Sequence, residues 1–175
     1  PSSYLNELLN TLYSEFNPHL IVPCLIEEPY DKAIKRIVER HRPDVIIHAS
    51  LRKFARHDSV EIGNFERTNY LQTFSVAKAA LRTGCGMFVL ISSREAENKE
   101  GIIGETLRVA ETSLKHFFKD TATRLSVVRL CDIIDNHRGL IAQLENRMRK
   151  GERISFSSDS TTHIISSKLA ASFVL

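Results

Sequence analysis

The 175-residue sequence has no long apolar run, few cysteines and little excess charge. No stretch approaches the roughly 20 consecutive apolar residues that span a bilayer, and no signal peptide is visible. We therefore expect no membrane contact from this segment, although the sequence leaves open an anchor upstream of Pro1. The formal net charge of +3 is too small to favour nucleic-acid binding. Hydrophobic residues make up 42% of the chain and charged residues 26%, which is typical of a globular domain.

Cysteine and histidine show no pattern of a metal site or a disulfide framework. The three cysteines, Cys24, Cys85 and Cys131, lack zinc-ligand spacing. Cys24 and Cys131 lie in apolar runs, so we expect both to be small core residues. The seven histidines also lack the spacing of metal ligands on one helix. These features predict a reduced, cytoplasmic protein without a metal.

Short apolar runs alternate with longer amphipathic stretches along the chain. The continuous, β-branched runs are typical of strands buried on both faces of a parallel sheet, and they predict strands over 19–26, 44–49, 87–92 and 125–130, with a weaker fifth over 153–157. Apolar residues at helical spacing predict helices over 4–16, 31–41, 69–81, 102–117 and 140–148. The alternation predicts one α/β domain over residues 1–175 with a mostly parallel sheet.

Polar residues follow the predicted strands at their carboxyl ends. His48, Ala49 and Ser50 end the second strand, Ser92 and Ser93 end the third, and Asp132 follows the fourth. Because ligands of open α/β sheets bind at this edge, we expect the functional site there.

Five segments in order along the chain resemble extended short-chain dehydrogenases/reductases that act on nucleotide sugars. They read RPDVIIHASLRKF (42–54), RTNYLQTFSVAKAALRTGCGMFVLISS (67–93), GIIGETLRVAE (101–111), LSVVRLCDII (125–134) and LENRMRKGERISFSSDSTTHII (144–165). The resemblance is closest to the polysaccharide-biosynthesis (CapD-type) group of epimerases and dehydratases, which includes UDP-N-acetylglucosamine 4,6-dehydratases. It implies a Rossmann-like three-layer sandwich, a nucleotide-sugar ligand and NAD or NADP as cofactor.

The first β-α-β unit of that family has no counterpart in this sequence. Its GxxGxxG turn would precede Pro1, and none of the seven glycines forms such a turn. Because those glycines let the backbone approach the pyrophosphate, we expect NAD or NADP to bind weakly or not at all. The predicted strand over 19–26 would also lie about 10 Å, two strand spacings, from the strand over 44–49. We therefore expect upstream residues, closure of the sheet, or a second copy or partner chain to pair the exposed edges.

The resemblance implies a set of cofactor-binding positions. These positions are Glu27, His48, Ala49, Ser50, Lys53, Asn69 and Ser92. Two of them have an alternative interpretation: Glu27 as part of a solvated acidic turn, and Asn69 as a structural support of the sheet.

The catalytic positions implied by the resemblance are the most altered. The family's Thr-Asp-Lys at the strand end becomes Ser93, Arg94 and Glu95. Ser93 could bind a sugar hydroxyl and Glu95 could transfer a proton, whereas the permanently protonated Arg94 could not. The Tyr-x-x-x-Lys pair falls on Ile103 and Leu107. Leucine cannot lower a tyrosine pKa or hold a nicotinamide ribose, so we expect Leu107 to extend the core.

Positions implied to bind substrate are altered as well. Asp132 replaces an asparagine expected near the diphosphate, and His163 replaces an arginine, whereas Thr162 is retained. A carboxylate at Asp132 would repel a diphosphate.

Three hypotheses follow from the sequence. The favoured one is a catalytically inactive relative that keeps the scaffold and binds a nucleotide weakly or supports a partner. The second is a fragment of an active NAD(P)-dependent enzyme with Glu95 as base and the glycine turn upstream. The third is an assembly module whose sheet edge pairs with another chain.

Overall fold

The computed structural model describes residues 3–26, 30–50, 67–98, 101–134, 139–155 and 161–175. The chain divides into two compact units, one of residues 24–129 and one of residues 1–23 with 130–175. The single domain over 1–175 stays a prediction, and the two units are described separately.

The unit of residues 24–129 alternates helices and strands, as the sequence predicts. Its elements are α2 (Tyr30–His41), β1 (Val45–His48), the π-helical segment η2 (Arg67–Gln72), α4 (Thr73–Thr83), β2 (Met87–Ser93), the 3-10 segment η3 (Arg94–Glu97), α5 (Ile102–Phe118) and β3 (Arg124–Leu130), whose last residue is assigned to the other unit. The predicted strands over 44–49, 87–92 and 125–130 are therefore confirmed, as are the helices over 31–41 and 102–117. The helix predicted over 69–81 divides into η2 and α4.

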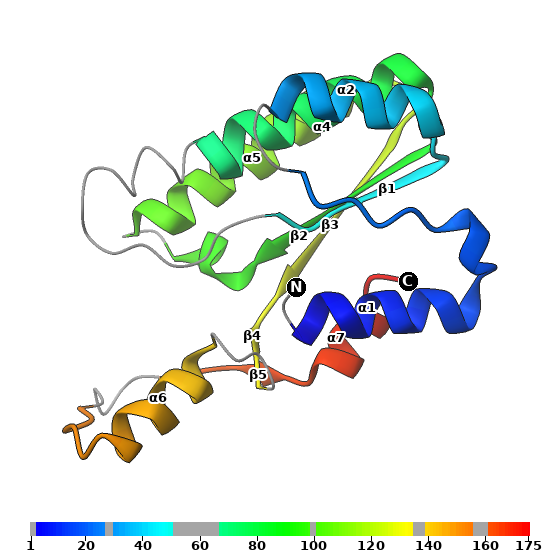
Figure 1. Ribbon diagram of the computed structural model, residues 1–175. Coiled ribbons are helices and arrows are strands. Elements are labelled where there is room, and N and C mark those ends of the chain that lie inside the picture. The colour runs from blue at the N-terminus through cyan, green and yellow to red at the C-terminus, as the bar shows by residue number, and fades with distance from the viewer. Residues whose placement is uncertain (1–2, 27–29, 51–66, 99–100, 135–138, 156–160) are drawn as a thin grey trace. The chain divides into compact units, whose positions relative to one another are not determined.

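The three strands form one sheet in the order β1-β2-β3. β1 pairs in parallel with β2, so that Ile46 lies opposite Phe88 and His48 opposite Leu90. The arrows of all three strands point the same way in Figure 1. This parallel arrangement brings the carboxyl ends of the strands to one edge of the sheet.

The core of this unit lies between the sheet and the layer formed by α2, α4 and α5 (Figure 1). Phe88 and Leu90 of β2 pack in one apolar cluster with Ile34 of α2, Ala77 of α4 and Leu114 of α5. Val89, on the opposite face of β2, is buried too. β2 is thus buried on both faces, which explains why its sequence is continuously apolar.

Local sequence explains where α4 ends. Gly84 caps its carboxyl end with a left-handed φ of 73°, and the Gly84 N–H bonds back to the last turn. Glycine adopts this conformation without the steric penalty that a β-carbon brings.

The second unit contains shorter elements. They are α1 (Ser3–Glu15), the 3-10 segment η1 (Pro18–Leu20), β4 (Asp132–Ile133), α6 (Leu140–Arg149), β5 (Ile164–Ile165) and α7 (Ser167–Ser172). α1 packs against α7, and β4 pairs in parallel with β5. The helices predicted over 4–16 and 140–148 are confirmed.

The strand predicted over 19–26 is wrong. Residues 18–20 form η1 and residues 21–26 form neither helix nor strand. Pro18 starts the 3-10 turn, and Pro23 has no N–H to donate to a sheet ladder. Leu20 is 78% exposed and Leu25 is 91% exposed, so these side chains are not held in a core. Residues 19–26 therefore do not form the expected buried strand at a distance from β1. Among the described strands, β1 still pairs only with β2, so its other edge has no strand partner there.

Two smaller expectations also fail. Cys24 is exposed rather than a core residue, because the segment around it is not a buried strand, and Cys131 is half-buried. Residues 153–155 of the weak fifth strand form no strand, while residues 156–157 lie outside the described residues.

Candidate functional site

The end of β2 places two buried serines at the carboxyl edge of the sheet. Ser92 donates a hydrogen bond from Oγ to Oε1 of Glu111 on α5, at 2.5 Å. Ser93 caps η3, where its Oγ accepts from the Glu95 N–H at 3.3 Å. Both hydroxyls are thus engaged in holding the chain as it leaves the strand.

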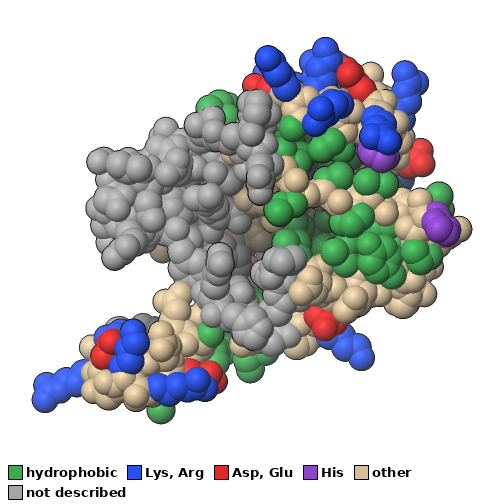
Figure 2. All heavy atoms as spheres, in the orientation of Figure 1, with side chains coloured by type: hydrophobic (Ala, Val, Ile, Leu, Met, Phe, Trp, Pro, Cys, Tyr) green, Lys and Arg blue, Asp and Glu red, His purple; other side chains and the backbone are tan. Residues whose placement is uncertain are grey.

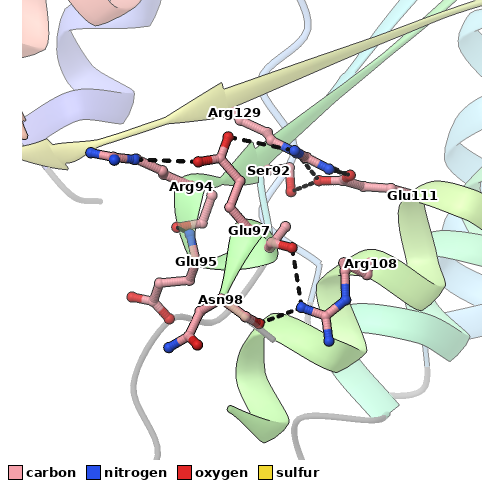
Figure 3. A network of polar contacts seen from close by, with 10 residues as sticks. Ser92, Arg94, Glu95, Glu97, Asn98, Arg108, Glu111 and Arg129 are labelled. Carbon is pink, nitrogen blue, oxygen red and sulfur yellow. Dashed lines mark hydrogen bonds and ion pairs between the residues drawn. The ribbon is translucent and has the colours of Figure 1, made fainter. Parts of the chain in front are cut away.

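A buried carboxylate organises this region. The Glu111 side chain is 3% exposed and accepts from Arg129 on β3, with Nη2 2.6 Å from Oε2 and Nε 3.1 Å from each carboxylate oxygen. Hydrogen bonding to Glu111 raises the pKa of Arg129 above its usual value. Figure 3 shows Ser92 and Arg129 converging on this carboxylate. The paired hydrogen bonds from Arg129 neutralise the negative charge of Glu111, which would destabilise the fold if it were buried without a partner.

A second, looser group of ion pairs lies toward solvent. Glu97, the last residue of η3, has Oε2 3.4 Å from Nε of Arg94 and Oε1 3.6 Å from Nη1 of Arg129. Its side chain is 53% exposed. One carboxylate is therefore shared by two guanidinium groups (Figure 3).

The first turn of α5 packs closely on η3. Arg108 donates from Nη1 to the carbonyl oxygens of Ala96, at 3.2 Å, and Asn98. Gly104 leaves no space for a side chain, because a β-carbon there would press on the Glu95 carbonyl oxygen and lie 2.6 Å from that of Asn98. These contacts fix the backbone that carries Arg94 and Glu95.

The α5 position that the resemblance assigns to the family's lysine is apolar and fully buried. Leu107 has no exposed surface, which confirms its predicted place in the core. Ile103 lies on the same helix, but its side chain is outside the described residues.

The end of β1 forms a separate polar cluster. The buried His48 has Nε2 2.9 Å from the Thr73 hydroxyl, and the Ser50 hydroxyl lies 3.2 Å from the same nitrogen. Burial lowers the pKa of His48 to about 4. The imidazole is therefore neutral at pH 7 and bonded to protein groups. Ala49 between them is half-buried.

The remaining predicted site residues lie either outside the described residues or in the second unit. Glu27 and Lys53 lie outside the described residues, and Asn69 lies in η2 with its side chain outside them. Asp132, Thr162 and His163 belong to the second unit, where the Asp132 N–H donates to the His163 carbonyl oxygen at 3.3 Å. Asp132 is half-buried, whereas Thr162 and His163 are exposed.

Sequence reasoning missed the charged network itself. Glu111, Arg129, Glu97, Arg108 and Thr73 were not predicted as site residues. One signal was present: Glu111 lies at helical spacing from Leu107 and Leu114, which puts a carboxylate on the apolar face of α5. Such a residue needs a buried partner.

The surface also carries a groove away from the strand ends. It lies between α2 and α4 and is lined by Asp31, Lys32, Lys35, Ser75, Lys78 and Arg82. Figure 2 shows Lys and Arg side chains gathered at the top of the view, over α2. Within the described residues, no group of His, Cys, Asp and Glu could hold a metal ion, and no helix is long and apolar enough to cross a bilayer.

Solved structures of nucleotide-sugar proteins share this fold. The UDP-glucose 4-epimerase of Thermotoga maritima, solved with UDP-glucose, aligns with a TM-score of 0.70 at 16% identity, covering 98% of this chain and 68% of the epimerase. WbmG of Bordetella bronchiseptica, solved with NAD and UDP, aligns with a TM-score of 0.70 at 15% identity, covering 96% of this chain and 63% of WbmG. The predicted Rossmann-like α/β fold is confirmed.

Sequence comparison gives the family. The probable polysaccharide biosynthesis protein EpsC of Bacillus subtilis is 25% identical over 162 residues, which cover 90% of this chain but only 27% of EpsC. This chain thus spans about a quarter of the length of that relative. The model of one family, described as polysaccharide biosynthesis protein, matches residues 5–175. The chain therefore belongs to the polysaccharide biosynthesis protein family, as the resemblance of its five segments predicts.

Proposed function

We propose that this chain is a catalytically inactive relative of nucleotide-sugar epimerases and dehydratases, which keeps the scaffold and binds a nucleotide sugar weakly or supports a partner. The observation that carries the proposal is the complete burial of Leu107. A buried isobutyl group has no proton to transfer and no charge to hold a nicotinamide ribose or lower a neighbouring pKa.

The strand end supports the same conclusion. Arg94 stands where the active relatives carry an acid/base group, and a guanidinium stays protonated at neutral pH. Ser92 and Ser93 are bonded to Glu111 and to the backbone of η3. The polar side chains at this edge thus stabilise the loop after β2.

Cofactor binding is the first test. WbmG was solved with NAD and UDP, but the glycine turn that would hold the pyrophosphate has no counterpart in this sequence. We expect calorimetric titration of the chain to give no saturable heat with NAD and weak binding of UDP-N-acetylglucosamine. Tight NAD binding by the chain alone would contradict the proposal.

A second candidate is a fragment of an active NAD(P)-dependent enzyme in which Glu95 acts as the base. The position of Ser93 and Glu95 directly after β2 favours it. Conversion of UDP-N-acetylglucosamine by the purified chain with NAD, lost in Glu95→Gln and kept in the exposed control Glu39→Gln, would establish it. Unchanged nucleotide sugar in all three samples would rule out catalysis by this chain alone.

A third candidate is an assembly module. β1 lies at one side of the described sheet, and Val45 at its start is 50% exposed. Such a strand can pair with a strand of a second copy or of a partner chain. Analytical ultracentrifugation tests self-association, and a monomer at all concentrations would count against a homo-oligomer.

A further inference from the structure

The two helices α2 and α4 carry the positive excess of this chain. Together they hold six Lys and Arg residues but only two acidic ones, Asp31 and Glu39. The formal net charge of the whole sequence is +3, so the remaining residues are close to neutral in sum. Figure 2 shows Lys and Arg side chains gathered over α2. The positive charge is thus concentrated on one pair of helices.

Four of these cations line the groove between α2 and α4. Lys32 and Lys35 come from α2, and Lys78 and Arg82 come from α4. All four residues are exposed, and none of the residues that line the groove is apolar. A ligand of this groove would therefore be held by charge rather than by an apolar anchor.

Most of the cations in the groove have no ionic partner in the described part of the chain. Among the residues that the structure describes, none forms an ion pair with Lys32, Lys78 or Arg82. Lys35 forms a long, exposed ion pair with Glu39, in which Nζ lies 3.9 Å from Oε1. Like charges along one groove repel one another, and an anion between the two helices would relieve this repulsion.

The one acidic residue of the lining does not cancel the positive charge. Asp31 lies in the first turn of α2 and accepts a hydrogen bond from the Ser75 hydroxyl on α4. One carboxylate among four cations leaves the groove positive, so it attracts anions. Lys32 lies in the same first turn, where the helix dipole favours acidic rather than basic side chains. Helix stability therefore does not explain this lysine.

The cations form two rows, one on each helix. Lys32 and Lys35 are three residues apart, and Lys78 and Arg82 are four residues apart. These spacings correspond to rises of about 4.5 and 6 Å along the helices. In an extended chain, side chains on one side are about 6.6 Å apart and neighbouring side chains point to opposite sides. A run of acidic residues lying along the groove would therefore direct alternate carboxylates to α2 and to α4.

We propose that the groove between α2 and α4 binds a short extended segment of a partner chain with about four consecutive acidic residues, two for each row of cations. The carboxylates bind Lys32, Lys78 and Arg82, and they compete with Glu39 for Lys35. The concave lining favours a peptide segment over a flat lipid surface. This inference deepens the partner-supporting role in the proposed function, and it does not depend on nucleotide-sugar binding.

The test is an NMR titration of the isotope-labelled chain, at low ionic strength, with a peptide of consecutive glutamates flanked by glycine and serine. We expect saturable shifts of backbone N–H signals in α2 and α4. The double variant Lys78→Gln with Arg82→Gln should bind about three- to thirtyfold more weakly, because each exposed ion pair contributes a small free energy. The spectrum of the variant without peptide checks that its fold is unchanged.

The matched control is the double variant Lys115→Gln with Arg124→Gln. It removes the same charge from exposed positions outside the groove, so it should bind like the parent. A second peptide carries the same glutamates separated by pairs of serines. Its carboxylates are about 10 Å apart in an extended chain, which exceeds the spacing of the cations, so it should bind more weakly.

Several outcomes would overturn the inference. Absence of shifts, equal weakening in the two double variants, or equal binding of the two peptides would each do so. Binding to phosphatidylserine vesicles but not to the peptide, lost in Lys78→Gln with Arg82→Gln, would assign the groove to a lipid surface instead. All of these outcomes leave nucleotide-sugar binding untouched, because that binding is measured in a separate titration.

Discussion

At the scale of single residues, two buried ionisable side chains stabilise the carboxyl end of the sheet through their hydrogen bonds. Glu111 carries a negative charge in a place where only 3% of its side chain meets solvent. Ser92 and Arg129 supply its hydrogen bonds. His48, in contrast, bonds through its ring to the hydroxyls of Thr73 and Ser50. From each of these two arrangements we predict a separate effect on the free energy of unfolding.

Arg129→Met should destabilise the fold, because it leaves the Glu111 carboxylate buried without its cation. We expect a loss of about 3 kcal/mol in the free energy of unfolding, measured with urea. Arg129→Met combined with Glu111→Leu should recover most of this loss, because the uncompensated charge is gone. A small effect of the single change, or a double variant less stable than the single one, would argue against a structural ion pair.

His48 should make the fold sensitive to mild acid. Its folded pKa of about 4 lies below its ordinary value of 6.5, so the unfolded chain binds a proton more readily. Stability from this group is complete above pH 6.5 and declines as pH falls to 4, by about 3 kcal/mol in total. Urea unfolding at several pH values should show a shallower decline in His48→Gln. Parallel pH profiles for the two proteins would contradict the assignment.

Leu107→Lys introduces the lysine that the family resemblance implies at this position, but we expect it to confer no activity. The ammonium group would be buried without a partner, and we expect a loss of about 4 kcal/mol or more. Leu107→Met keeps the volume and should cost less than about 1.5 kcal/mol. Thermal unfolding of both variants gives the comparison, and a stable, active Leu107→Lys protein would refute the assigned core role.

At the scale of elements, close packing of α5 on η3 positions the strand end. Gly104 makes this contact, because its missing side chain lets the helix reach the carbonyl oxygens of Glu95 and Asn98. Gly84, at the end of α4, is needed for a different reason, since it adopts a positive φ of 73° with open space around it.

The two glycines should respond differently to alanine. Gly84→Ala meets only backbone strain, of about 1 kcal/mol. Gly104→Ala must push α5 away from η3 and should cost about 2 to 3 kcal/mol, which outweighs the helix propensity of alanine. Urea unfolding ranks the variants. A Gly104→Ala protein as stable as the parent would mean that α5 does not pack this closely.

Elements with a single strong pattern could be predicted from the sequence. The apolar spacing of Ile34 and Val38 gives α2, and the continuous apolar run of β2 reflects its burial on both faces. The segment over 19–26 has the composition of a strand, but Pro18 and Pro23 prevent regular pairing. Two-residue strands such as β4 and β5 depend on partners distant in sequence, so they leave no periodic signal.

At the scale of the whole molecule, the fold and family could be predicted because many weak similarities occur in one order. For the site, the sequence predicts which residues lie at the strand ends, but it does not predict their hydrogen bonds. Residue spacing carries no information on contacts between side chains that are distant in sequence. The contact of Glu97 with Arg94 and Arg129 depends on how η3 turns after β2. Among the site positions, the burial of Leu107 could be predicted from its apolar side chain on α5.

The central claim is that this scaffold performs no proton or hydride transfer on a nucleotide sugar. The most direct measurement is incubation of the chain with NAD and UDP-N-acetylglucosamine in D2O, followed by mass spectrometry of the recovered sugar. Exchange of a sugar C–H for deuterium would reveal even an incomplete reaction cycle. We predict no incorporation of deuterium, and incorporation that depends on both the protein and NAD would contradict the account.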